Sequence, residues 1–95
     1  MVRHIVLWKL KECPEKAENA ARIKQGLEAL VGVIPGLLSL EVGKNVTPGE
    51  YDLCLVSDFT SKEALALYQG HPAHDKVRQF VHQVIEGRVA ADYER

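Results

Sequence analysis

The first eleven residues predict a β-strand that must be covered on both of its faces. Residues 2–11 are rich in Val, Ile, Leu and Trp, which favour strands. Even positions carry Val6 and Trp8, and odd positions carry Ile5 and Leu7. Because successive side chains of a strand point to opposite faces, both faces of this strand are apolar. Such a strand needs packing partners above and below its sheet.

The rest of the chain predicts the element order strand, helix, strand, strand, broken helix, strand. Apolar residues recur every three or four positions in the helical segments and cluster in the strand segments. The expected elements after the first strand are a helix over 15–33, strands over 37–44 and 51–59, helices over 61–69 and 72–86, and a strand over 88–93. This order is typical of an α+β protein with the ferredoxin-like βαββαβ fold, a four-stranded antiparallel sheet with helices on one face.

Local signals mark several helix ends. The spacing of Thr60 and Glu63 matches a capping box, so we expect the Thr60 oxygen to accept from the backbone N–H of Glu63. Pro72 suits the first position of the last helix, and Gly87 is expected to be its C-terminal cap. Pro35-Gly36 is expected to end the first helix.

The predicted helices cover one sheet face and leave the other open. Ile5, Leu7, Cys54 and Val56 fall on the open side of the first and third strands. An apolar sheet face of this kind is normally buried. A second copy of the same chain is the simplest cover, so we expect a homodimer, a dimeric α+β barrel.

Length and composition limit the classes of protein to consider. The 95 residues leave room for one domain, 1–95, because domains rarely have fewer than about 50 residues. The net charge of −1 lacks the basic excess of a nucleic-acid binder. No apolar run approaches the length of about 18 residues that spans a membrane, and no signal peptide is evident. We therefore expect a cytoplasmic protein without nucleic-acid or membrane partners, and free thiols at Cys13 and Cys54.

The segment 68–74, Tyr-Gln-Gly-His-Pro-Ala-His, carries the best candidates for chemistry. His74 falls in the first turn of the last helix and lies three residues before Val77, on the inward side. A helix N-terminus disfavours imidazolium, which keeps a histidine neutral as a general base requires. Tyr68 ends the preceding helix, where it is either a core aromatic or a site residue.

Three further candidates lie on the predicted sheet. The first and last strands of this fold are antiparallel neighbours, so Asp92 should lie close to His4 and fix the tautomer of its imidazole. Arg88 shares the parity of Asp92, which predicts that it enters the pocket, where a guanidinium suits a carboxylate or phosphate. His82 is expected to be a solvated residue on the polar side of the last helix.

The expected pocket lies between the sheet and the helices within one subunit. Its expected walls are Val6, Trp8, Ile23, Leu27, Leu55 and Val81, with Arg88 and Asp92 as polar groups. No metal and no cofactor are expected, because the pair His71 and His74 supplies two ligands at most and no phosphate-binding loop is present.

The chain resembles the stress-responsive α/β-barrel family, also called the Dabb family. The resemblance rests on Val2-Arg3-His4-Ile5-Val6-Leu7-Trp8, Ile34-Pro35-Gly36, Gly43-Lys44-Asn45-Val46, Tyr51-Asp52-Leu53, Phe59-x-Ser61-x-Glu63-Ala64-Leu65, Tyr68-x-x-His71-Pro72-Ala73-His74 and Asp92-Tyr93-Glu94. It implies a ferredoxin-like subunit that dimerises through its sheets. One plant branch, the olivetolic acid cyclases, closes a linear polyketide by aldol chemistry. By that resemblance the catalytic residues are Tyr68, His74 and His4.

Three functions stay open from the sequence. The first is a cofactor-free enzyme of the cyclase or isomerase type, with His74 as base and Tyr68 as donor. The second is a non-catalytic module that binds a small apolar or acidic metabolite in the same pocket. The third is a structural stress-response protein in which these residues serve folding and assembly.

Overall fold

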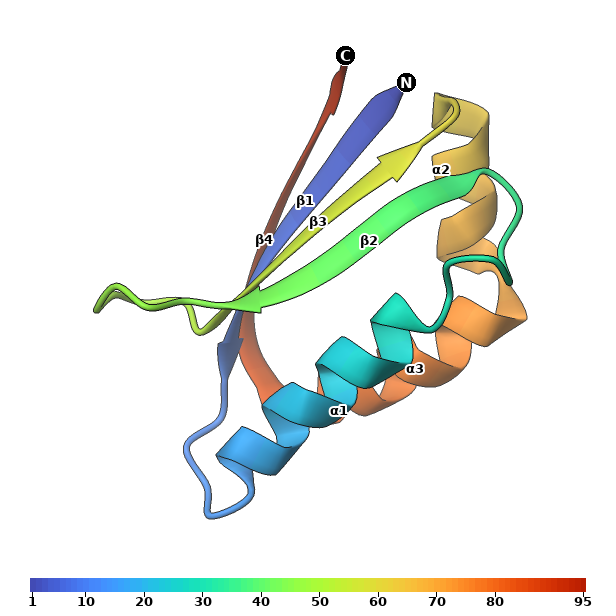
Figure 1. Ribbon diagram of the computed structural model, residues 1–95. Coiled ribbons are helices and arrows are strands. Elements are labelled where there is room, and N and C mark those ends of the chain that lie inside the picture. Colours follow the sequence, from blue (N-terminus) through green and yellow to red (C-terminus); the bar gives the residue numbers. More distant parts are fainter.

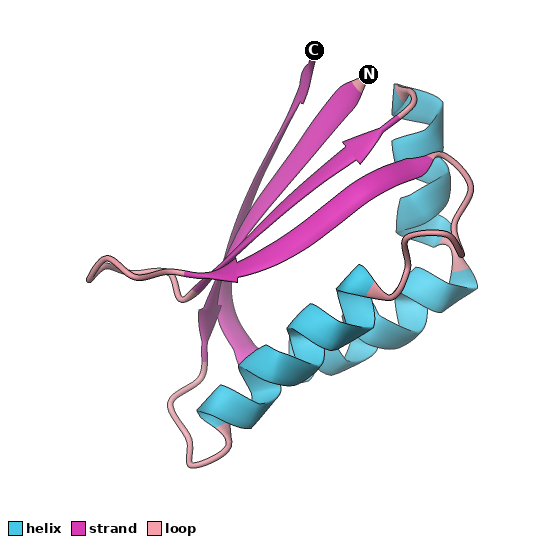
Figure 2. Cartoon of the chain, in the orientation of Figure 1, coloured by secondary structure: helices cyan, strands magenta, loops and turns pink.

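The computed structural model describes all of residues 1–95 and forms one sheet with helices packed on one of its faces (Figure 1, Figure 2). The elements are β1 (Val2–Leu10), α1 (Lys16–Glu28), β2 (Leu37–Lys44), β3 (Leu53–Phe59), α2 (Lys62–Gly70), α3 (Pro72–Val84) and β4 (Ile85–Glu94). The strand order is β2-β3-β1-β4, and every neighbouring pair is antiparallel. The predicted ferredoxin-like fold is confirmed.

β1 is a central strand with two different faces, as its sequence predicts. Its even positions are buried beneath the helices, and its odd positions are half-buried on the open side of the sheet. Trp8 is paired with Leu53 of β3 and with Arg88 of β4, so these three residues share the helix-facing side. Leu7, paired with Cys54, lies on the open side.

The core fills the layer between the sheet and the helices. Ile23 and Leu27 of α1 and Val81 of α3 are buried against the sheet. Fully burying a side chain of this size contributes about 1.5–3 kcal/mol. α1 and α3 run side by side (Figure 1). Their close approach depends on Gly26, where an added Cβ would lie 3.1 Å from the Val77 side chain.

α1 is shorter than the predicted helix over 15–33. It ends at Glu28, and residues 29–34 continue as turns with tighter hydrogen bonds, such as Leu30 N to Leu27 O at 3.1 Å. Gly32 then adopts a φ of 87°, which a continuing helix does not allow. Leu30 and Ile34 are nevertheless buried, so the apolar periodicity correctly identified core residues but not the end of the helix.

The end of the last helix was also predicted wrongly. α3 stops at Val84, and β4 begins at once with Ile85, which pairs with Leu10 across an irregularity in the β1–β4 register. Gly87 therefore lies within β4, opposite Lys9, and is not a helix cap. Strand pairing with β1 takes precedence over the helical pattern of the last residues.

Two other predicted ends differ by one or two residues. The N-cap of α2 is Ser61 rather than Thr60, and its hydroxyl accepts from the Ala64 N–H at 3.1 Å. Glu63 therefore makes no capping box. The third strand begins at Leu53 rather than at residue 51, because Asp52 instead binds the end of β1 through the Leu10 N–H at 2.7 Å.

Gly36 sets the connection between α1 and β2. It has a φ of 86°, and an added Cβ would lie 2.6 Å from Cβ of Ala64 on α2. Both the conformation and the contact require glycine.

None of the three helices combines the length and apolar composition needed to cross a lipid bilayer.

Candidate functional site

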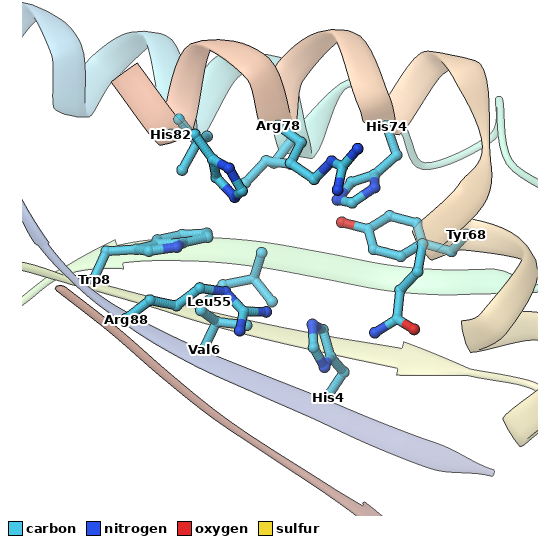
Figure 3. Close-up of a pocket in the computed structure, with 12 residues that line it drawn as sticks. His4, Val6, Trp8, Leu55, Tyr68, His74, Arg78, His82 and Arg88 are labelled. Atoms are coloured by element: carbon cyan, nitrogen blue, oxygen red, sulfur yellow. The ribbon is translucent and has the colours of Figure 1, made fainter. Parts of the chain in front are cut away.

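A cavity of about 370 Å³ lies between the sheet and the helices (Figure 3). The lining residues come from β1, β3 and β4 on one side and from α1, α2 and α3 on the other. They are His4, Val6, Trp8, Leu27, Leu55, Tyr68, Gln69, His74, Arg78, Val81, His82 and Arg88. Apolar walls with a few convergent polar groups are typical of small-molecule sites.

Tyr68 and His74 meet because the chain breaks between α2 and α3. His71 lies at this break in an extended conformation, and its Nδ1 accepts from the Ala73 N–H at 3.0 Å to cap α3. Pro72 begins α3, so His74 falls in its first turn. The rings of Tyr68 and His74 stack with centroids 4.2 Å apart and planes tilted by 35°.

Both side chains keep polar atoms free for a bound molecule. Nδ1 of His74 is the one buried side-chain nitrogen or oxygen in the chain without a hydrogen-bond partner. Nε2 of His74 and the Tyr68 hydroxyl make no protein hydrogen bond either. Unlike Nδ1 of His74, these two atoms are not fully buried, so they are accessible from the cavity. An unpartnered buried polar atom is rare in proteins and often marks a functional position.

Burial sets the protonation of this pair. Removal from water lowers the pKa of His74 below its ordinary value of 6.5, and Arg78 and His4 lower it further. The backbone of Gln69 and the carboxylate of Asp75 act in the opposite direction without reversing the shift. Burial raises the pKa of the Tyr68 hydroxyl. At neutral pH the site therefore holds an uncharged imidazole beside a protonated phenol.

His4 closes the same end of the cavity from the sheet. It pairs in register with Asp92 of β4, and its Nδ1 is hydrogen-bonded to the Asp92 carboxylate. Because a carboxylate only accepts, Nδ1 of His4 carries the proton of this hydrogen bond. The expected proximity of His4 and Asp92 is confirmed.

Two residues expected in the pocket do not line it. Ile23 is completely buried in the core, one turn before Leu27 on α1. Asp92 lies on the edge strand β4 and reaches the site only through His4. The other expected residues line one cavity: His4, Val6, Trp8, Leu27, Leu55, Tyr68, His74, Val81 and Arg88.

Sequence reasoning missed Gln69 and Arg78 and misjudged His82. His82 is exposed, as expected, but it also lines the cavity. Arg78 and His82 follow His74 at intervals of four residues, so all three lie on one side of α3 (Figure 3). The four-residue spacing could have indicated that Arg78 and His82 share the inward side of His74, but polar side chains on a helix normally indicate a solvated face.

A larger hollow of about 790 Å³ lies between α1 and the loop after β2. Three of its four charged side chains, all but Lys44, already have partners within the protein. Lys16 is paired with Asp52 at 3.2 Å, and Lys24 is paired with Glu28 at 2.7 Å. The smaller cavity, where polar atoms are free, is therefore the stronger candidate site.

Possible metal ligands are scattered in this fold. No group of three or more His, Cys, Asp or Glu side chains lies close enough to hold a metal ion. The chemistry that the cavity offers directly is proton transfer and hydrogen bonding by His74, Tyr68 and His4.

Residues 2–95 match the family model described as the Stress responsive A/B Barrel Domain, or Dabb. An uncharacterised protein of Streptomyces coelicolor is 36% identical over 99% of both chains. The crystal structure of a dimeric protein of unknown function with a ferredoxin-like fold, from Bacteroides fragilis, is 34% identical and has a TM-score of 0.92, with coverage of 99% of this chain and 95% of that chain. A crystal structure of a protein from Arabidopsis thaliana is 30% identical with a TM-score of 0.83, covering 100% of this chain and 95% of that one.

Proposed function

The chain belongs to the stress-responsive A/B barrel domain family, and we propose that it is a cofactor-free enzyme that moves a proton on a small carbonyl compound held in the cavity. The base is His74 and the donor is Tyr68. The observation that carries this proposal is their stacked arrangement at one end of an open cavity, with Nε2 and the hydroxyl unpartnered.

His74 removes the proton. Its imidazole is uncharged at neutral pH because burial lowers its pKa. With its proton on Nδ1, the neutral ring leaves Nε2 free to accept a proton from the carbon next to the carbonyl. The electron pair of the broken C–H bond moves onto the carbonyl oxygen and forms an enolate. A positioned general base contributes about 10²–10⁴-fold to such a step.

Tyr68 stabilises the charge that develops on oxygen. Its hydroxyl stays protonated because burial raises its pKa, so it donates a hydrogen bond to the enolate oxygen. The ring is fixed between His74 and Phe59, whose centroid lies 5.0 Å from it. A donor that is oriented before the reaction stabilises the transition state most effectively.

The enolate has two productive fates. Return of the proton to a different carbon completes an isomerisation. Attack of the enolate carbon on a second carbonyl of the same molecule closes a ring, and the resulting alkoxide takes back the proton from His74, as in the polyketide cyclisation of the olivetolic acid cyclase branch that this chain resembles. Both reactions use the same base and the same donor and need no cofactor.

The alternative is a binding module without catalysis. The apolar walls formed by Val6, Trp8 and Leu55 support this function equally. A binding module needs the cavity to hold a ligand but does not need His74 and Tyr68 to transfer a proton. A purely structural role has less support, because a structural histidine normally bonds both ring nitrogens whereas His74 has an unpartnered one.

The open face of the sheet supports a homodimer. Ile5, Leu7, Cys54 and Val56 are half-buried there, and Val89 of β4, which pairs with Leu7, is 44% exposed. A second copy of this face would bury the apolar surface of both chains. The Bacteroides fragilis structure, described as dimeric, supports a homodimer.

Hydrogen–deuterium exchange of a ketone tests the enzyme proposal without knowledge of the natural substrate. Benzylacetone and benzoylpropionate are incubated with the protein in D2O, and loss of the proton next to the ketone is followed by NMR. We expect the wild-type protein to accelerate exchange of at least one probe and His74→Gln to lose most of the acceleration.

His71→Asn is the matched control, because asparagine keeps an N-capping acceptor at the start of α3. We expect it to retain the wild-type exchange rate. Probe binding without accelerated exchange would favour the non-catalytic binding module, and the absence of both would contradict any small-molecule function of this cavity.

A further inference from the structure

The charged side chains that line the cavity are all positive; Arg88 lies toward the end away from Tyr68 and His74, whereas Arg78 lies beside His74 (Figure 3). Arg88 enters from β4, and Arg78 and His82 enter from α3 on the opposite wall (Figure 3). No aspartate or glutamate is among the lining residues. This local excess of positive charge stands against a net charge of −1 for the whole chain.

The two arginines differ in how far their charge is already neutralised. Arg78 is ion-paired with Asp75, one turn earlier on α3. Arg88 forms no salt bridge in the structure, where nine such pairs involve other residues. A guanidinium placed beside an apolar cavity without a carboxylate is prepared to bind an anion.

The apolar neighbours of Arg88 indicate the kind of molecule that carries this anion. Arg88 is paired in register with Trp8, whose ring forms the wall beside it, and Val6 and Leu55 continue that wall toward His74. A molecule with one charged end and an apolar body would place its charge at Arg88. Its body would then extend to the end where Tyr68 and His74 lie.

We propose that the ligand of this cavity is a monocarboxylic acid with an apolar body, its carboxylate held by Arg88 with His82 as a further donor. The single unpaired guanidinium matches one negative charge, whereas a dianionic phosphate would leave one charge uncompensated. This inference rests on the proposed small-molecule function and adds its substrate class, because it names the group that orients the carbonyl compound toward His74.

Trp8 makes the inference testable, because it is the only tryptophan of the chain and lines the cavity. Its fluorescence is titrated with phenylacetate, phenylacetamide and benzylphosphonate, which share an aromatic body and differ in the charge of the head group. We expect phenylacetate to bind at least tenfold more tightly than phenylacetamide, and also more tightly than benzylphosphonate.

Three variants locate the charge that is responsible. Arg88→Gln should reduce the affinity for phenylacetate at least tenfold and leave that for phenylacetamide unchanged, and Arg88→Lys should retain part of the preference. Lys76→Gln removes an exposed charge from α3, outside the cavity lining, and should change neither affinity.

The outcomes separate this inference from the function on which it rests. Equal binding of phenylacetate and phenylacetamide would still show that the cavity is a ligand site, but it would contradict the inference that Arg88 binds a carboxylate. Tighter binding of benzylphosphonate would replace the carboxylate by a phosphate-like group and overturn the inference. If no probe changes the fluorescence at millimolar concentrations, both the inference and the proposed function are wrong.

Discussion

The aromatic ring of Tyr68 stacks on the imidazole of His74, with centroids 4.2 Å apart, across the break between α2 and α3. Neither the Tyr68 hydroxyl nor Nε2 of His74 is used by the protein itself. The pair therefore contributes a packed contact to the fold while its polar atoms remain available to a ligand.

Tyr68→Phe separates the hydroxyl from the ring. The variant keeps the stacking on His74 and the contact with Phe59. We expect ketone exchange to fall about 10²–10³-fold, the usual effect of removing one donor to a developing oxyanion. Thermal unfolding should be nearly unchanged, because the hydroxyl has no protein partner. Exchange at the wild-type rate would remove Tyr68 from the proposed chemistry.

The pH dependence of exchange should report His74. Its pKa in the folded protein lies below 6.5, so most of the base is in its active, uncharged form at pH 7 and is lost as the pH falls through that lower value. Exchange per unit protein, measured by NMR between pH 4.5 and 9, should show an acid limb with its midpoint below 6.5. A midpoint above 6.5 would mean that the imidazolium is favoured in the site, contrary to this account. Circular dichroism across the same range separates loss of the base from acid unfolding.

The open sheet face should hold two copies of the chain together. Leu7→Lys places a charge among Ile5, Cys54 and Val56, and we expect it to dissociate the dimer or to unfold the chain. Light scattering after size-exclusion chromatography measures the outcome at micromolar concentrations. A stable interface buries more than about 1,000 Å² in total. We expect a charge introduced into the apolar part of such an interface to disrupt it.

Leu67→Lys is the control for that experiment. Leu67 is 70% exposed on α2, on the helix side of the molecule. We expect this variant to keep the mass of the wild-type protein. A wild-type protein that is monomeric at micromolar concentration would contradict the dimer.

Gly36→Ala should destabilise the fold. The new Cβ would meet Cβ of Ala64 at 2.6 Å, and the residue would keep a φ of 86° that alanine rarely adopts. We expect a loss of more than about 1 kcal/mol in the free energy of unfolding, measured with urea. Gly70→Ala is the control, since its Cβ would meet no atom within 4 Å, and it should be neutral or stabilising.

The alternation of β1 explains why so much of the site could be predicted from the sequence. Once His4, Val6 and Trp8 share one face, the antiparallel neighbour β4 must place Arg88 and Asp92 on that face too. Strand parity is strict, so these positions follow from the element order together with the register that pairs His4 with Asp92.

Helix ends and helix-borne polar residues could not be predicted in the same way. Ile85 leaves the helical pattern because it pairs with Leu10, a contact between residues far apart in the sequence. Arg78 and His82 have the polar character of solvated residues, and only the position of the sheet shows that their side of α3 lines a cavity.

The stability and the activity of His74→Phe, measured together, test most directly whether His74 serves chemistry rather than folding. Phenylalanine keeps an aromatic ring on Tyr68 and removes the buried Nδ1 that has no partner. We predict that its free energy of unfolding in urea stays within about 1 kcal/mol of the wild-type value, since no hydrogen bond is lost, while ketone exchange is abolished. A clear loss of stability with exchange and probe binding intact would show that His74 is a core residue and would contradict the proposed site.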